Sequence, residues 1–185
     1  EVNIGTPIPG VEIKIVGSDG CEIMDGSPGE LHVRGPNVML GYFRQPELTE
    51  AVIDKDGYLN TGDIVSVNSK QEMVVQGRTK ELIIRSGFNV YPPEIEAALN
   101  THPAVLNSAV VGRSIEGNEE IVAFVEPVPG CHIEIDTLFA LLDEQLARYK
   151  KPQKIIVMSQ LPVAPNGKIR KNDLKKYAET LPSFA

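Results

Sequence analysis

The sequence of 185 residues is poor in cysteine and holds no long apolar run. Cys21 and Cys131 lie far apart, and we interpret them as free thiols of a reducing compartment, with a single disulfide as the alternative. No apolar stretch approaches the about 20 residues that cross a bilayer, and no signal peptide is recognisable. These absences predict a cytoplasmic protein without a transmembrane segment.

Two common kinds of site also lack their sequence signatures. The only histidines, His32, His102 and His132, are not spaced as metal ligands, and no cluster of cysteines or carboxylates accompanies them. The phosphate-binding pattern G-x-x-x-x-G-K-[ST] does not occur. The sequence therefore predicts no metal site of its own and no nucleotide site of the P-loop kind.

The chain also has no excess of positive charge: its formal net charge is −7. An acidic protein of this kind is not expected to bind nucleic acid or an anionic membrane surface. Local basic clusters at 148–154 and 168–176 still leave room for a small anion such as ATP.

The first part of the chain is rich in short, β-branched segments that alternate apolar and polar residues, as half-buried strands do. Turn signals such as Asp19-Gly20 and Asp56-Gly57 separate them. The pattern predicts a small barrel or an appended sheet. The expected strands are 11–16, 31–34, 64–67 and 73–75, and the expected helix is 46–53.

The second part mixes helical and strand-like segments, which predicts helices packed on a sheet. We therefore expect an α+β fold in two parts, a β-rich subdomain at 1–78 and a compact α+β domain at 79–185. The expected strands are 81–85, 105–111, 121–125 and 155–158, and the expected helices are 92–100, 136–146 with Asp136 as N-cap, and 174–178.

The most informative segment is the turn Pro165-Asn166-Gly167, which presents Lys168 near the end of the chain. Asn-Gly adopts the positive φ angles of a tight turn. A lysine there offers a point charge to a phosphate or a developing oxyanion. The alternative is a solvated lysine in a basic tail together with Lys171, Lys175 and Lys176.

Asp63 and Arg78 suggest a second site. A carboxylate after the Thr61-Gly62 turn can accept hydrogen bonds from vicinal hydroxyls such as those of a ribose. A guanidinium can bind phosphate or ribose oxygens. Alone, Asp63 is better explained by a structural role in its own turn, and Arg78 is equally consistent with a plain surface arginine.

Lys80 stands where the fold changes character, so it is a candidate pivot. It precedes the Ser86-Gly87-Phe88-Asn89 segment, which we expect to form a turn between strands. Gly87 would let a ligand approach the backbone closely, and a plain hairpin is the alternative.

Together these motifs, in their order and spacing, resemble the adenylate-forming superfamily of acyl-CoA synthetases, luciferases and peptide-synthetase adenylation domains. Lys80 at the hinge position, and the 146–152 segment, resemble the acyl-CoA synthetase branch. The matching motifs are Gly5-Thr6-Pro7-Ile8-Pro9-Gly10, Gly29-Glu30-Leu31, Gly41-Tyr42 with Pro46 and Thr49, Thr61-Gly62-Asp63, Gly77-Arg78-x-Lys80-Glu81-x-Ile83, Ser86-Gly87-Phe88-Asn89-Val90-Tyr91-Pro92-Pro93-Glu94-Ile95-Glu96 and Pro165-Asn166-Gly167-Lys168-Ile169.

The resemblance implies an acid–thiol ligase that uses ATP, Mg²⁺ and CoA. A carboxylic acid, expected to be a fatty acid, attacks the α-phosphate of ATP to give acyl-adenylate and pyrophosphate, and CoA then displaces AMP. A small C-terminal domain pivots between the two steps. By position, the implied roles are Asp63 for ribose, Arg78 for ribose or phosphate, Lys80 as hinge, Asn89 near AMP, Ser86 and Gly87 at the CoA tunnel, and Lys168 at the carboxylate and α-phosphate.

The family's phosphate loop, adenine-stacking aromatic residue, magnesium glutamate and acyl pocket have no counterpart in this sequence. The chain begins at Glu1, and its motifs start about two-thirds of the way along a typical member. We therefore expect the C-terminal part of a larger enzyme, inactive without its large N-terminal domain. The alternatives are an enzyme that loads a carrier protein and a non-catalytic regulatory module.

Overall fold

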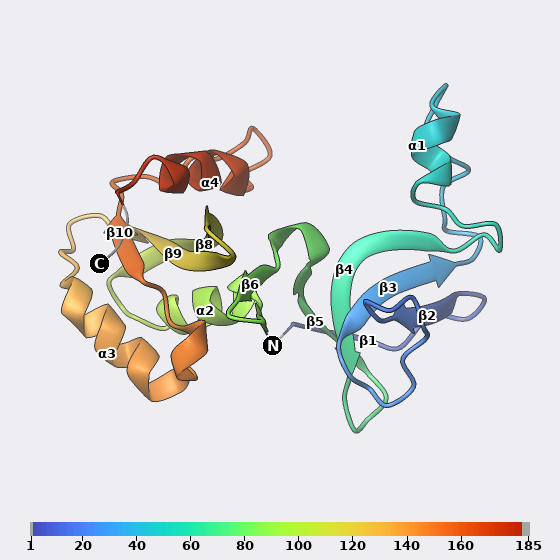
Figure 1. The fold of residues 1–185 in the computed structure, drawn as a ribbon, viewed down its shortest axis with the longest axis horizontal. Coiled ribbons are helices and arrows are strands. Elements are labelled where there is room, and N and C mark those ends of the chain that lie inside the picture. The colour runs from blue at the N-terminus through green and yellow to red at the C-terminus, as the bar shows by residue number, and fades with distance from the viewer. Residues whose placement is uncertain (1, 183–185) are drawn as a thin grey trace. The chain divides into compact units, whose positions relative to one another are not determined.

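The computed structural model describes residues 2–182 of the chain (Figure 1). The chain divides into two compact units, Glu1–Lys80 and Glu81–Ala185, each described below by itself. The division falls two residues after the boundary expected between Arg78 and Thr79.

The first unit is built on a five-stranded sheet in the order β1-β5-β4-β3-β2, in which every neighbouring pair is antiparallel. Of the two expected forms, a small barrel or an appended sheet, the described residues adopt the sheet. Ile15, Leu31, Val65 and Met73 form its core. The strands are β1 (Val2–Gly5), β2 (Glu12–Val16), β3 (Gly29–Arg34), β4 (Leu59–Val67) and β5 (Met73–Arg78).

Three details of this unit differ from expectation. Strand β1 was not expected, because it is only four residues long and, although Val2 and Ile4 alternate with Asn3 and Gly5, its residues are mostly exposed. Strand β4 begins five residues early, at Leu59, and passes through Gly62 at φ +70°, so the expected Thr-Gly turn is an irregular part of a strand. Helix α1 (Pro46–Glu50) ends before Ile53, because Ile53 forms a bridge with Leu59.

The second unit has a three-stranded sheet in the order β10-β9-β8 and a small β6-β7 hairpin. Strand β8 is antiparallel to β9, and β10 is parallel to it. Its elements are η1 (Thr79–Glu81), which spans the division, β6 (Ile83–Arg85), β7 (Phe88–Val90), α2 (Pro92–Leu99), β8 (Val105–Ile115), β9 (Asn118–Pro127), α3 (Ile135–Gln145), η2 (Arg148–Lys150), β10 (Lys154–Val157) and α4 (Lys171–Glu179).

Helices cover both faces of this sheet, as Figure 1 shows for α4 on one side and for α2 and α3 on the other. Side chains along a strand point alternately to opposite faces. Val110 and Ala123 therefore join the core under α2 and α3, whereas Val111 and Phe124 join the core under α4. The α+β class expected from the sequence is confirmed.

Several local expectations for this unit were wrong in detail. Glu81 belongs to the 3₁₀ turn η1 and not to a strand, which begins at Ile83. Asp136 is not an N-cap: α3 begins at Ile135, after Glu134, and Asp136 lies in its first turn. Helix α4 begins at Lys171, three residues before the expected start.

One buried charge ties the end of α4 to the sheet. Arg113 on β8 is 7% exposed, and its guanidinium donates to the carbonyl oxygens of Leu181 at 2.6 Å and Pro182 at 2.8 Å. It also lies 3.4 Å from a carboxylate oxygen of Glu120. The segment after α4 is thus held to the sheet by hydrogen bonds to a charged group, which are stronger than neutral ones.

Both cysteines are free and exposed. Among residues 2–182, no helix is long and apolar enough to cross a bilayer.

Candidate functional site

Two of the expected site residues are direct partners in the first unit. Asp63 on β4 pairs across the sheet with Arg78 on β5, and Nε of Arg78 donates to Oδ1 of Asp63 at 2.7 Å. The side chains are 32% and 61% exposed, respectively. The pair therefore presents a carboxylate and a guanidinium side by side to solvent, the two groups expected to bind a ribose and a phosphate.

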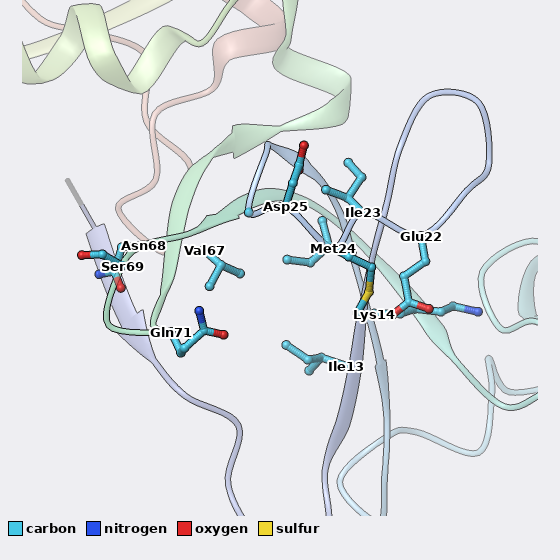
Figure 2. A pocket seen from close by; sticks show the side chains of 12 residues that line it. Ile13, Lys14, Glu22, Ile23, Met24, Asp25, Val67, Asn68, Ser69 and Gln71 are labelled. Atoms are coloured by element: carbon cyan, nitrogen blue, oxygen red, sulfur yellow. The ribbon is translucent and has the colours of Figure 1, made fainter.

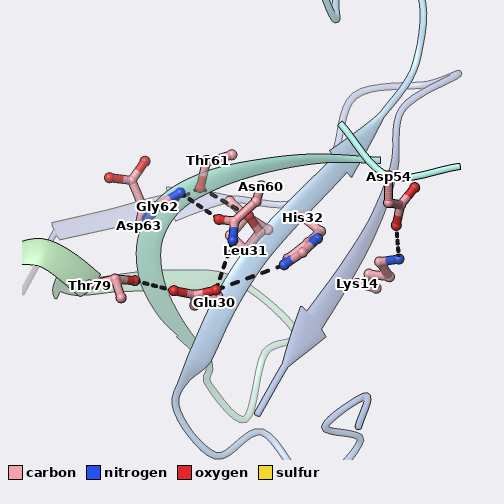
Figure 3. A network of polar contacts seen from close by, with 10 residues as sticks. All are labelled: Lys14, Glu30, Leu31, His32, Asp54, Asn60, Thr61, Gly62, Asp63 and Thr79. Carbon is pink, nitrogen blue, oxygen red and sulfur yellow. Dashed lines mark hydrogen bonds and ion pairs between the residues drawn. The ribbon is translucent and has the colours of Figure 1, made fainter. Parts of the chain in front are cut away.

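A network of hydrogen bonds fixes the backbone that carries Asp63 (Figure 3). The amide nitrogen of Asp63 donates to Oγ1 of Thr61 at 3.1 Å, and Thr61 donates from the same oxygen to the carbonyl of Leu31 at 3.0 Å. The nitrogen of Gly62 donates to Oδ1 of Asn60 at 2.8 Å. These bonds hold the irregular part of β4 in one conformation.

Glu30 connects this network to the end of the unit (Figure 3). Its carboxylate accepts from Nδ2 of Asn60 at 2.8 Å and from Oγ1 of Thr79 at 2.5 Å. Thr79 directly precedes Lys80, which is exposed and is the last residue before the division between the units. The expected pivot is therefore anchored on its first-unit side.

The first unit also has a pocket of about 440 Å³ that contains none of the expected site residues. Figure 2 shows Ile13 and Met24 on one side of it and Val67 and Gln71 on the other. It lies between β2, the segment that follows β2 and the β4–β5 turn.

Lys168 lies in a hairpin of the second unit, between β10 and α4. Val163 and Ile169 form a bridge at the base of this hairpin. The nitrogen of Ala164 donates to the carbonyl of Lys168, and that of Gly167 donates to the carbonyl of Ala164, both at 2.8 Å. Gly167 has φ +80°, a conformation suited to glycine. The backbone is thus fixed while the Lys168 side chain is exposed.

A pocket of about 650 Å³ adjoins Lys168. Its lining combines the Lys168 hairpin with the start of α4, the start of β8 and the turn η1. The lining residues are Glu81, Asn107, Val163 and 167–173.

Ser86 and Gly87 form the two-residue turn between β6 and β7. Their φ angles are +51° and +82°, and Arg85 pairs with Phe88 across the turn. Positive φ at both central residues is the pattern of a type I′ hairpin turn. The turn is thus two residues long, and Asn89 belongs to β7, where it is exposed.

The Ser86-Gly87 turn and the Lys168 hairpin lie toward opposite ends of β8. The nitrogen of Ser86 donates to Oδ1 of Asn118 at 2.7 Å, and Asn118 pairs with Ile115. Asn107, at the other end of β8, lines the pocket of Lys168. Ile115 lies eight positions after Asn107 along the strand, roughly 26 Å at about 3.3 Å per residue. The structure therefore does not bring these two candidate sites together.

Two neighbours of the turn are held in place by polar contacts. Nη1 of Arg85 donates to the carbonyls of Tyr149 at 3.0 Å and Lys151 at 2.7 Å, and burial lowers the pKa of Arg85. Burial raises the pKa of Tyr91, while its hydrogen bond with Asn89 acts in the opposite direction. Arg85 thus supports the segment that follows α3.

Sequence reasoning missed a half-buried charge three residues after Lys168. The interpretation of Lys171 as part of a solvated basic tail is wrong, because its side chain is only 22% exposed and its Nζ lies between the carboxylates of Glu81 and Glu96. Glu81 and Glu96 belong to recognised motifs, but nothing in the sequence shows that distant carboxylates converge on one lysine.

Comparison with known proteins gives two family matches. The model described as AMP-binding enzyme matches residues 1–43, and the one described as AMP-binding enzyme C-terminal domain matches residues 94–168.

Named relatives agree with these matches. The chain is 39% identical to an indoleacetate–CoA ligase of Aromatoleum aromaticum over 93% of its length and 34% of the relative's. It is 38% identical to a long-chain-fatty-acid–CoA ligase of Escherichia coli O157:H7 over 95% of its length and 31% of the relative's. The ATP-bound crystal structure of MatB from Rhodopseudomonas palustris matches with a TM-score of 0.88 at 36% identity, covering 96% of this chain and 36% of MatB.

The fold and these matches define a class: the chain belongs to the AMP-binding, adenylate-forming family. Within it, the curated relatives described above are named CoA ligases. The chain spans about a third of their length.

Proposed function

We propose that this chain serves as the C-terminal part of an ATP-dependent acyl-CoA synthetase. In the first step a carboxylate attacks the α-phosphorus of ATP, and the bond to pyrophosphate breaks. In the second step the CoA thiol attacks the acyl carbon and AMP leaves. The named CoA ligases and the ATP-bound relative support this reaction class.

The observation that carries the proposal is the placement of Lys168 at the end of a rigid hairpin with its amine exposed. An ammonium carried on a fixed backbone stabilises negative charge that concentrates at the carboxylate and α-phosphate without any change of protonation. In our proposal Asp63 binds the ribose hydroxyls, Arg78 binds ribose or phosphate, and Asn89 lies near AMP.

We further propose that the unit after Lys80 pivots between the steps and brings Ser86 and Gly87 to the CoA thiol. Support comes from their location toward the opposite end of β8 from Lys168. Two sites that far apart on one unit cannot serve one reacting centre without a rotation.

The decisive experiment uses the complete enzyme that contains this chain. For Lys168→Ala, we expect ATP–pyrophosphate exchange to fall by about 10²–10³, while the release of AMP from supplied acyl-adenylate by CoA is spared. Lys176→Ala, an exposed lysine of α4, is the matched control and should change neither rate. Equal loss of both half-reactions in Lys168→Ala would reject the assigned role.

Substrate, metal and setting belong to the same proposal. We propose a fatty acid as substrate, as in the name of the Escherichia coli relative. Because another relative is named an indoleacetate–CoA ligase, the assay should compare a fatty acid with an aryl acid. Mg²⁺ is proposed as the counter-ion of the ATP phosphates. A cytoplasmic setting is supported by the two exposed free cysteines.

The proposal also predicts that the 185-residue chain alone has no ATP–pyrophosphate exchange activity. CoA, rather than the phosphopantetheine of a carrier protein, is the proposed acceptor, and a rate comparison of the two acceptors tests this. A non-catalytic module would show no loss in the complete enzyme after substitution of Asp63, Arg78 or Lys168.

A further inference from the structure

Lys171 is the most enclosed of the basic side chains around the Lys168 hairpin. Its Nζ lies 2.6 Å from Oε2 of Glu81 and 2.8 Å from Oε1 of Glu96. The three residues come from α4, η1 and α2, which are far apart in sequence. One ammonium group therefore joins three elements of the second unit.

The position of Lys171 is unfavourable for its own helix. It is the first residue of α4, and a positive charge at a helix N-terminus opposes the helix dipole. Burial also opposes protonation, but the carboxylates of Glu96 and Glu81 more than offset it and raise the pKa of Lys171 above its ordinary value. The charge is thus retained by its two partners and not by the helix.

Glu96 is itself anchored, and Glu81 lies at the start of the unit. Oε1 of Glu96 also accepts the backbone N–H of Val110 on β8 at 2.7 Å, so it is anchored to the central hairpin of the unit. Glu81 directly follows Lys80, the proposed pivot. The ammonium thereby links the start of α4 to the sheet and to the first residue after the pivot.

The Lys168 hairpin ends immediately before this link. Ile169 closes the hairpin by its bridge to Val163, and the nitrogen of Arg170 donates to the carbonyl of Pro162 at 2.8 Å. No residue of free loop separates this closed base from Lys171. Whatever fixes Lys171 therefore fixes the direction in which the hairpin extends.

We propose that Lys171 is a positioning residue that holds the Lys168 hairpin against Glu81 and Glu96, so that Lys168 moves with the unit as a rigid group. This inference rests on the proposed function for its catalytic consequence. The structural part of the inference, that Lys171 keeps the hairpin ordered, does not depend on that function.

The first test measures amide hydrogen exchange of the 185-residue chain. In Lys171→Met, which keeps the apolar stem and removes the charge, we expect faster exchange at the backbone amides of 164–170 and unchanged exchange in β8 and β9. Lys171→Arg should restore the slow exchange, and Lys176→Met, on the exposed face of α4, should leave it unchanged. Unchanged exchange in Lys171→Met overturns the proposal whatever the chain's function is.

The second test uses the complete enzyme. We expect Lys171→Met to lower kcat for ATP–pyrophosphate exchange by about 10- to 100-fold, as for a reacting group displaced by about 1 Å, with KM for ATP and the rate of thioester formation nearly unchanged. Lys171→Arg should recover the exchange rate. An equal fall in both half-reactions, or no fall in either, overturns the positioning role.

Lys171→Met leaves two carboxylates facing each other, so Glu81→Gln provides a milder variant that keeps an acceptor oxygen. It should show the same selective loss, smaller than in Lys171→Met. A selective loss in Lys168→Ala together with no effect in Glu81→Gln and Lys171→Met would overturn this inference and leave the proposed function standing.

Discussion

At the scale of single residues, the pair of Asp63 and Arg78 matters for what it presents rather than for what it stabilises. Both side chains are partly exposed, and an ion pair of that kind contributes about 0–1 kcal/mol to folding. The pair is nevertheless held by an ordered backbone and by cross-strand pairing. A well-ordered pair of low energetic value is consistent with a binding role.

We predict that Asp63→Asn and Arg78→Gln weaken nucleotide binding without unfolding the unit. In the complete enzyme each should raise KM for ATP about tenfold or more, as expected from loss of a charged hydrogen bond worth about 1.5–3 kcal/mol. Thermal unfolding of the 185-residue chain should change little. Arg34→Gln, which breaks an exposed ion pair with Glu12 on the same sheet, is the control and should leave KM unaffected.

The residues named from the sequence and those it missed differ in one physical respect. Lys168, Asp63 and Gly87 lie in turns or irregular strand segments with recognisable local chemistry, so their positions were predictable even though their roles remain predictions. Lys171 and Glu30 act through partners on distant elements, and long-range convergence leaves no local signal in one sequence.

At the scale of elements, periodicity located the central segments of most strands and helices but not their ends. Strands β8 and β9 extend beyond the predicted segments, because their far ends are mostly polar and still pair with each other. The start of α3 was misplaced because Asp136 has the chemistry of a cap but lies one residue inside the helix. Pairing partners and caps are settled by tertiary structure.

The β6–β7 turn leads to a prediction at this scale. Gly87→Ala should lower the stability of the chain by about 1 kcal/mol, because φ of +82° is unfavourable for alanine while an added Cβ meets no atom within 4 Å. In the complete enzyme it should also slow thioester formation and spare adenylate formation.

Gly130→Ala is the matched control for this prediction. Its φ of +83° and open surroundings give the same backbone cost, but it lies in the turn before α3, where no site residue was predicted. Equal kinetic effects of the two substitutions would remove Gly87 from the proposed CoA site.

At the scale of the whole molecule, each unit has a hydrophobic core of its own. Val65 belongs to the core of the first unit, and Leu142 belongs to the core under α2 and α3 in the second. Both side chains are 0% exposed. A unit with its own core has the means to fold independently.

We therefore predict that scanning calorimetry of the 185-residue chain resolves two transitions. Leu142→Ala should cost about 2–5 kcal/mol and lower the melting temperature of one transition, whereas Val65→Ala should lower only the other. A single transition that both substitutions shift together would contradict the prediction.

The hydrogen bonds from Arg113 to the carbonyls of Leu181 and Pro182 have a practical consequence for protein engineering. Cutting the polypeptide after Thr180 would strip a buried guanidinium of two acceptors, each worth about 1.5–3 kcal/mol. A shortened version made for crystallisation or for fusion to a reporter should therefore retain Pro182 and append any tag beyond it.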